Sequence, residues 1–126
     1  MKKFLLIVAC ACLVSCDSYS ERIVGPYIAI AIDEPSNMSI SYDLGGGSSI
    51  GKIDAEVVAV GFNDKFIIAK QRPLSDPSKV NYFYLEMAKD SKYANPSKSL
   101  TGPLSEKDFM ESKSRLGLPD FTRTFR

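Results

Sequence analysis

The segment EVVAVGFNDKFIIA, residues 56–69, has the clearest strand pattern in the chain. Its two apolar runs, residues 56–62 and 66–69, are rich in valine and isoleucine, which favour β-strands. Asn63 and Asp64, between the runs, are residue types that form tight two-residue turns. The stretch therefore predicts a buried antiparallel hairpin in the middle of the chain.

A second hairpin is predicted on the N-terminal side of this one. Residues 28–32 alternate isoleucine with alanine, and residues 38–42 alternate large apolar side chains with serine, so both runs have the period of a strand. The turn-forming residues 33–37 join the two runs. In the first run, the side chains expected to face the core are Ile28, Ile30 and Ile32.

The remaining segments are expected to be loops, apart from one further strand and one helix. Residues 80–87 predict that fifth strand. Its expected inward side chains are Phe83, Leu85 and Met87. The glycine-rich and serine-rich residues 43–52 and the polar residues 89–102 predict loops. The basic tail, residues 120–126, is expected to fray.

One helix is predicted near the C-terminus. In LSEKDF, residues 104–109, Ser105 is the expected N-cap and the acidic residues after it suit the positive end of the helix dipole. Phe109 and Leu116 are seven residues apart, so they lie on one face and should pack on the sheet. Gly117 is the expected C-cap glycine.

The first sixteen residues have the pattern of a bacterial lipoprotein signal. Lys2 and Lys3 precede an apolar run, residues 4–14, which is shorter than the ~20 residues of a membrane-spanning helix. The sequence LVSC, residues 13–16, resembles a lipobox, in which Cys16 is acylated and becomes the new N-terminus. A plain secretory signal and a buried core helix are the alternatives. The first usually ends in an Ala-x-Ala-like site, and the second needs a polar face.

These patterns divide the chain into three parts: a lipoprotein signal peptide, residues 1–15; a lipidated cysteine with a short tether, residues 16–22; and one domain, residues 23–126. The expected fold class of the domain is α+β, an antiparallel β-meander of about five strands with one C-terminal helix packed on the sheet. The protein is expected to be exported from the cytoplasm and held at the bacterial cell membrane or envelope by its lipid.

Composition argues against several classes of function. Loss of Lys2 and Lys3 with the signal leaves a net charge of about −1, whereas a nucleic-acid partner needs a strongly basic face. The sequence contains no histidine, and Cys16 is the one cysteine that remains after cleavage. We therefore expect no metal site that needs imidazole or thiolate, no cofactor, and no Ser-His-Asp or Cys-His catalysis.

The glycine-rich segment contains most of a phosphate-binding pattern, Gly46-x-x-x-x-Gly51-Lys52. Ile53 stands where a serine or threonine would hold magnesium, and strand-like sequence follows where a helix is needed. The segment is therefore interpreted as a mobile connection, and no nucleotide is expected to bind.

Five carboxylates surround the first two predicted turns: Asp33, Glu34, Asp43, Asp54 and Glu56. A pair of carboxylates at the right separation can hydrolyse a glycoside, and oxygen ligands can bind calcium. No spacing motif supports either chemistry, so solvated turn residues are the simpler interpretation.

Aromatic residues gather around the fifth predicted strand. Tyr82, Tyr84 and Tyr93 form a candidate interaction surface, because tyrosine is enriched at interfaces. Packing within the domain is the alternative interpretation.

Three segments carry a resemblance to a known family: FIIAKQRP, residues 66–73; NYFYLEM, residues 81–87; and GPLSEKDFMESKSRLGLP, residues 102–119. Together with the lipobox, they resemble a family of small bacterial lipoproteins that carry a domain of unknown function. The resemblance implies an exported lipoprotein and brings no catalytic residues with it.

Three functions remain in view. The first is a non-catalytic binding or interaction module, anchored to the membrane of the envelope, with a protein as its expected partner. The second is an immunity-type or inhibitory lipoprotein that shields its host. The third is a carboxylate-based glycan hydrolase. We expect the protein not to be an enzyme.

Overall fold

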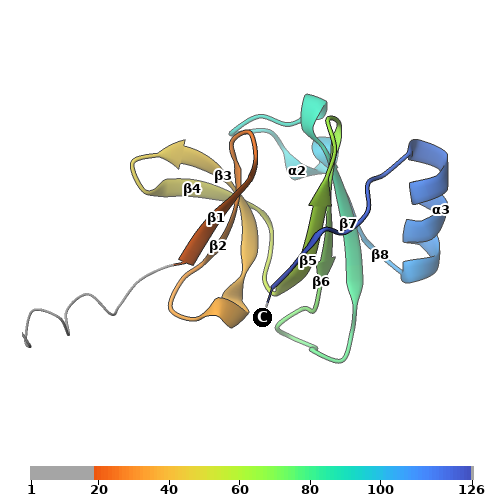
Figure 1. The fold of residues 1–126 in the computed structure, drawn as a ribbon, viewed down its shortest axis with the longest axis horizontal. Helices are drawn as coiled ribbons and strands as arrows, with labels where there is room; N and C mark the ends of the chain where they lie inside the picture. The colour runs from red at the N-terminus through yellow and green to blue at the C-terminus, as the bar shows by residue number, and fades with distance from the viewer. Residues whose placement is uncertain (1–18, 126) are drawn as a thin grey trace, which may run out of the picture.

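The computed structural model describes residues 19–125, and within them nine strands form two antiparallel sheets (Figure 1). Sheet A contains, in spatial order, β1 Tyr19–Val24, β2 Tyr27–Ala31, β3 Ser39–Gly45 and β4 Ser48–Ile53. Sheet B contains, in spatial order, β8 Leu100–Leu104, β7 Asn81–Glu86, β6 Phe66–Gln71, β5 Val57–Phe62 and β9 Arg123–Thr124. The helical segments are η1 Pro35–Asn37, η2 Met87–Lys89, α2 Pro96–Ser99 and α3 Glu106–Leu116.

The elements form three layers, with sheet B between sheet A and helix α3 (Figure 1). Strand β7 shows why sheet B has two buried faces. Phe83 and Leu85 belong to the core between the sheets, whereas Tyr82 and Tyr84 pack in a second cluster with Phe109 of α3. The prediction that Phe83 and Leu85 point inward is confirmed. The expected α+β class with a C-terminal helix on a sheet is also confirmed.

The expected number of strands was too low. In place of one meander of about five strands, the described residues form two sheets that pack face to face. The additional strands are β1, β4, β8 and β9, which are short, polar or rich in glycine and so lack the hydrophobic alternation of the others.

The orientation predicted for β2 was wrong. Tyr27, Ala29 and Ala31 face the core between the sheets, and Ile28 and Ile30 lie on the outer face of sheet A. Alternation fixes the period of a strand but not which of its two faces is buried. The small alanines fit the close contact between sheets, while Ile32 lies beyond the strand end and is exposed.

The segment expected to be a loop, residues 43–52, is a hairpin formed by the end of β3 and by β4. Gly45, Gly46 and Gly47 all have positive φ, at 86°, 64° and 86°. Glycine adopts this conformation without steric cost, so these residues make a tight turn between two strands. Similarly, the segment 89–102 contains α2 and most of β8.

Both ends of the domain are ordered where a tether and a frayed tail were expected. Strand β1 begins at Tyr19, inside the predicted tether, and β9 pairs with β5. Arg123 joins the two ends, because its Nε and Nη2 each donate to the carboxylate of Glu21 at 2.7 Å. Phe125 is buried in the core between the sheets. These contacts join residues that are far apart in sequence, so a local sequence pattern cannot predict them.

Helix α3 forms as predicted. The Ser105 Oγ accepts a hydrogen bond from the backbone N–H of Asp108 at 3.1 Å, which is the contact of an N-cap. Gly117 ends the helix with φ of 70°, and its N–H donates to the carbonyl oxygen of Lys113 at 2.9 Å. Phe109 is buried against sheet B, and Leu116 packs beside it. Among the described residues, no helix has the length and apolar character needed to cross a membrane.

Candidate functional site

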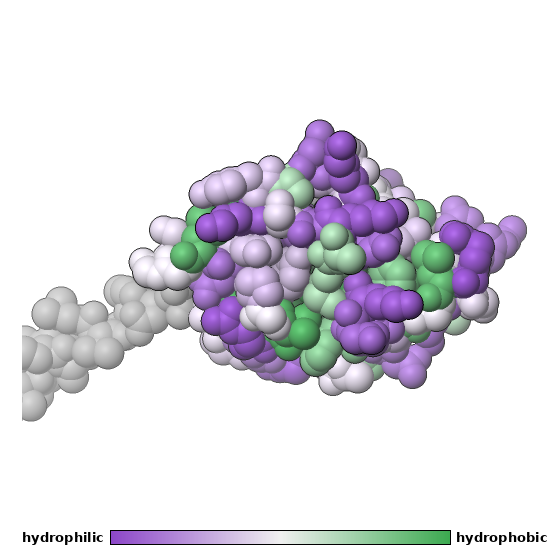
Figure 2. Space-filling model, turned by 90° about the horizontal axis from the view of Figure 1, so that it is seen from above, coloured by the Kyte–Doolittle hydropathy of each residue, from purple (hydrophilic) through white to green (hydrophobic). Residues whose placement is uncertain are grey.

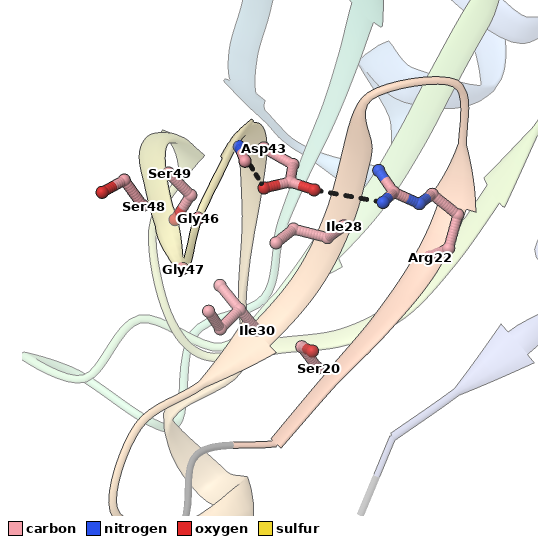
Figure 3. A pocket seen from close by; sticks show the side chains of 10 residues that line it. Ser20, Arg22, Ile28, Ile30, Asp43, Gly46, Gly47, Ser48 and Ser49 are labelled. Carbon is pink, nitrogen blue, oxygen red and sulfur yellow. Dashed lines mark hydrogen bonds and ion pairs between the residues drawn. The ribbon is translucent and has the colours of Figure 1, made fainter.

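A groove of about 330 Å³ lies on the outer face of sheet A (Figure 3). Ile28 and Ile30 of β2 form its apolar floor, and the turn between β3 and β4, residues 45–49, forms one wall. Arg22 and Asp43 lie together at one end, and Ser20 lies near the other end of the floor (Figure 3). The groove is thus apolar at its base and polar at its rim.

Irregular pairing explains why the β3–β4 hairpin forms a wall. The register between β3 and β4 shifts between Ile40 and Ser41, and again between Asp43 and Gly45. Such bulges bend a strand and increase its twist. The hairpin therefore does not continue flat beside β2, and Figure 3 shows it beside the isoleucine side chains.

A charged pair closes one end of the groove. The Arg22 Nη2 lies 3.1 Å from the Asp43 Oδ2, and its Nη1 donates to the carbonyl oxygen of Gly25. The N–H of Gly45 donates to the Asp43 Oδ1 at 2.9 Å. This backbone hydrogen bond, and after it the contact with Arg22, holds the pKa of the Asp43 carboxyl below its usual value. Asp43 is therefore charged at neutral pH.

A second polar cluster is buried between sheet A and the segment that follows β7. The Nζ of Lys52 lies 3.1 Å from the Asp90 Oδ1, and the two side chains are 3% and 0% exposed. The Tyr27 hydroxyl donates to the Asp90 Oδ2 at 2.7 Å, and the Ser99 hydroxyl donates to the Oδ1 at 3.1 Å. Lys52 also donates to the carbonyl oxygen of Ser91 at 2.9 Å.

This cluster joins sheet A to the segment that follows β7 of sheet B, and its role is structural. Burial, and after it the hydrogen bond to Asp90, raises the pKa of the Tyr27 hydroxyl, so tyrosine stays protonated and remains a donor. Within the described part of the chain, every buried side-chain nitrogen and oxygen has a hydrogen-bond partner. The lysine of the Gly46–Lys52 pattern thus contacts Asp90 inside the protein and does not line the groove.

Comparison with known families supports the expectation of a domain of unknown function. Residues 24–122 match the model of a family described as "Protein of unknown function (DUF3997)". The chain belongs to the DUF3997 family. No curated protein and no solved structure matches the chain.

The DUF3997 match covers most of the groove. It includes the isoleucine floor and the β3–β4 wall, while Ser20 and Arg22 lie before its first residue. It also includes both Lys52 and Asp90. The predicted lipidation residue, Cys16, lies outside both the match and the residues that the structure describes.

The five predicted carboxylates do not come together in the groove of this DUF3997 protein. Asp43 lines the groove and contacts Arg22, whereas the other four do not line it. Glu34 instead accepts a hydrogen bond from the Ser36 hydroxyl at 2.8 Å in the turn after β2. Asp54 and Glu56 lie in the connection between β4 and β5. Within residues 19–125, no group of three or more aspartate, glutamate, histidine or cysteine side chains could hold a metal ion.

The three predicted surface tyrosines have different environments. Tyr82 is buried, because its ring stacks on Phe109 with the centroids 4.9 Å apart. Tyr84 is half-buried and meets the ring of Phe66 edge-on. Tyr93 alone of the three is exposed. The expectation of an interaction surface is therefore wrong for Tyr82, since α3 covers the face of β7 to which it belongs.

Sequence reasoning missed both the groove and the buried cluster. The alternation in residues 28–32 predicts Ile28 and Ile30 in the core, whereas they form the floor of the groove. The cluster joins Lys52 to Asp90, which are 38 residues apart in sequence. Its one local signal is a lysine placed in a strand next to a buried isoleucine, Ile53.

Proposed function

We propose that this DUF3997 protein is a lipid-anchored, non-catalytic binding module of the bacterial cell envelope, and that its binding surface is the groove on sheet A. The export pattern of residues 1–16 supports the location, and the LVSC sequence supports acylation of Cys16. Because acylated lipoproteins carry two or more acyl chains, the anchor would be stable.

The groove is the observation that carries the binding role. Its volume of about 330 Å³ lies at the lower end of the range of small-ligand pockets, ~300–1,000 Å³. Two of its ten lining residues, Ile28 and Ile30, are apolar, and the others are glycines or carry polar side chains, so the groove is more polar than most small-ligand sites. The isoleucines would supply apolar contact, and the backbone and serines of residues 45–49 would orient the occupant.

The position of the groove suits an anchored protein. Cys16 precedes Ser20 by four residues, which span at most about 14 Å when fully extended. A partner in the groove would therefore be held close to the lipid surface, where tethering raises its effective concentration. An immunity-type protein would be a special case, in which the bound partner is a toxin or an enzyme.

The charge state of Asp43 argues against the glycan hydrolase. Such an enzyme needs one carboxyl group that keeps its proton and donates it to the leaving oxygen. Asp43 is the one carboxylate of the five candidates that lines the groove, and its contacts with Gly45 and Arg22 lower its pKa, so the groove holds no carboxyl group suited to be the general acid.

Photo-crosslinking tests the role of the groove. A photoreactive phenylalanine analogue at position 30 would lie on the groove floor, and the same analogue at the exposed position 93 is the matched control. In native membranes we expect a discrete crosslinked product from position 30 and none from position 93. The additional substitution Ser49→Trp, which fills the groove from its wall, should abolish the product. Equal crosslinking at both positions, or no product at position 30, would contradict the proposal.

A further inference from the structure

We propose that one end of the domain rests directly on the surface of the bilayer, through the exposed side chains of Tyr19, Ile32, Leu74 and Val80. We further propose that the lipid headgroups in contact with this end are zwitterionic. The inference rests on the proposed acylation of Cys16 and deepens it, because it assigns the orientation of the anchored domain. We call the part of the protein surface that these four residues form the membrane-facing end.

The four side chains are all exposed to solvent. Ile32 is 62% exposed, Leu74 59%, Tyr19 44% and Val80 39%. They are four of the eight large hydrophobic side chains that are exposed among residues 19–125. Single exposed apolar residues are common, but four at one end of a small domain form a surface that a partner or a membrane can cover.

Strand pairing places all four at the same end of the molecule. Tyr19 pairs with Ala31, the residue before Ile32. Gln71 pairs with Asn81 at the end of the β6–β7 ladder, so Leu74 and Val80 lie in the connection beyond it. The ends of the two sheets are joined there, because the N–H of Val57 donates to the carbonyl oxygen of Met38 at 2.8 Å. Figure 1 shows the β2–β3 and β6–β7 connections together at the lower end.

Exposed hydrophobic side chains also occur at the opposite end, where Phe62 lies at the far end of the β5–β6 ladder and Tyr93 follows η2. Figure 2 views the molecule from above and shows a mostly hydrophilic face, on which hydrophobic residues occur in separate small groups.

The length of the tether identifies the occupant as lipid. Cys16 is three residues before Tyr19, a span of at most about 11 Å. A lipid on Cys16 would therefore hold Tyr19 within reach of the headgroups. Tyrosine is enriched at this depth in membrane proteins, because its ring is apolar and its hydroxyl group is polar.

The charged side chains at the membrane-facing end indicate which headgroup charge it prefers. Asp33, Glu34 and Asp76 are exposed there, and the exposed cations of the same two connections are Arg72 and Lys79. The excess of carboxylates would be repelled by an anionic surface, which attracts basic segments. Zwitterionic headgroups that carry an ammonium group, such as phosphatidylethanolamine, offer the carboxylates a partner. The membrane-facing end is therefore expected to prefer zwitterionic lipid.

Fluorescence quenching in vesicles tests the orientation. The described residues contain no cysteine, so Ile32→Cys, Leu74→Cys and the controls Tyr93→Cys and Met110→Cys each give one labelling site outside the signal and Cys16. All four positions are at least half exposed, so the substitutions should leave the fold intact. The labelled, full-length acylated protein is reconstituted in phosphatidylethanolamine–phosphatidylcholine vesicles whose headgroups carry a quencher.

We expect several-fold stronger quenching at positions 32 and 74 than at positions 93 and 110. Replacing part of the lipid with phosphatidylglycerol should reduce the quenching at 32 and 74. Uniform quenching of the acylated protein, or stronger quenching at 93 or 110, would overturn the orientation while leaving the anchor in place. Quenching that increases with phosphatidylglycerol would overturn the lipid preference. Mass spectrometry of the same samples reports acylation, and a chain without lipid would overturn both this inference and the proposed function.

Discussion

Replacing Asp90 with alanine is expected to lower the free energy of unfolding by about 3–5 kcal/mol, the usual cost of removing one partner of a buried ion pair. The substitution removes the acceptor of three hydrogen bonds, from Tyr27, Lys52 and Ser99. The ammonium group of Lys52 would remain buried with the Ser91 carbonyl oxygen as its hydrogen-bond partner. The cost therefore comes mainly from an uncompensated buried charge.

Urea unfolding monitored by circular dichroism measures this effect, and two variants make it specific. The neighbouring ion pair between Lys89 and Glu86 spans 3.4 Å on the surface, so Lys89→Ala should cost less than about 1 kcal/mol. The double variant Lys52→Met with Asp90→Leu removes both charges and should recover part of the stability lost in Asp90→Ala, while the buried hydroxyls of Tyr27 and Ser99 still lack their acceptor. If Asp90→Ala and Lys89→Ala lower the free energy of unfolding equally, the buried cluster does not stabilise the contact between sheet A and the segment after β7.

Replacing Gly61 with alanine is expected to destabilise the protein by about 3 kcal/mol, the upper part of the range for overpacking. A Cβ at this position would collide with the carbonyl oxygen of Asp120 and lie 3.1 Å from the Cα of Phe121. These atoms belong to the backbone, so no change of rotamer relieves the contact. The C-terminal segment would have to move away from β5.

Gly51→Ala is the matched control, because a Cβ at Gly51 has no heavy atom within 4 Å and should change stability by less than about 0.5 kcal/mol. Amide hydrogen exchange gives a local readout beside the unfolding midpoint. The N–H groups of Thr122 and Phe125 donate to the carbonyl oxygens of Val60 and Val58 at 3.0 and 2.9 Å. In Gly61→Ala these two amides should lose protection first. Unchanged protection would show that the segment does not depend on the close approach at Gly61.

Local sequence patterns predicted the elements that are stabilised by contacts between residues close together in sequence. The hairpin of β5 and β6 follows from its apolar runs and the turn between them, and α3 follows from Ser105, Gly117 and the spacing of Phe109 and Leu116. Each of these signals lies within fourteen residues of sequence, so it can be interpreted without the folded environment.

The errors arose where tertiary structure decides between equal local alternatives. Alternation in β2 suits either face, and the packing of sheet A on sheet B selected the alanines for the core. The glycines of residues 45–47 suit a flexible loop or a tight turn, and pairing of β3 with β4 selected the turn.

The candidate groove was beyond local prediction for the same reason. Its floor depends on which face of β2 is buried, and its wall depends on two bulges in the β3–β4 ladder. The Arg22–Asp43 pair that closes it joins residues 21 positions apart. Family membership of residues 24–122 agrees with the resemblance seen in the C-terminal segments, and it assigns no ligand to the groove.

Metabolic labelling detects the lipid on Cys16, which both the proposed location and the proposed orientation of the domain require. Cells that express the full chain are grown with a clickable palmitate analogue, and the protein is purified and probed for the label. We expect labelling of the wild type and none of Cys16→Ala. A wild type that carries no more label than Cys16→Ala would contradict the proposed acylation.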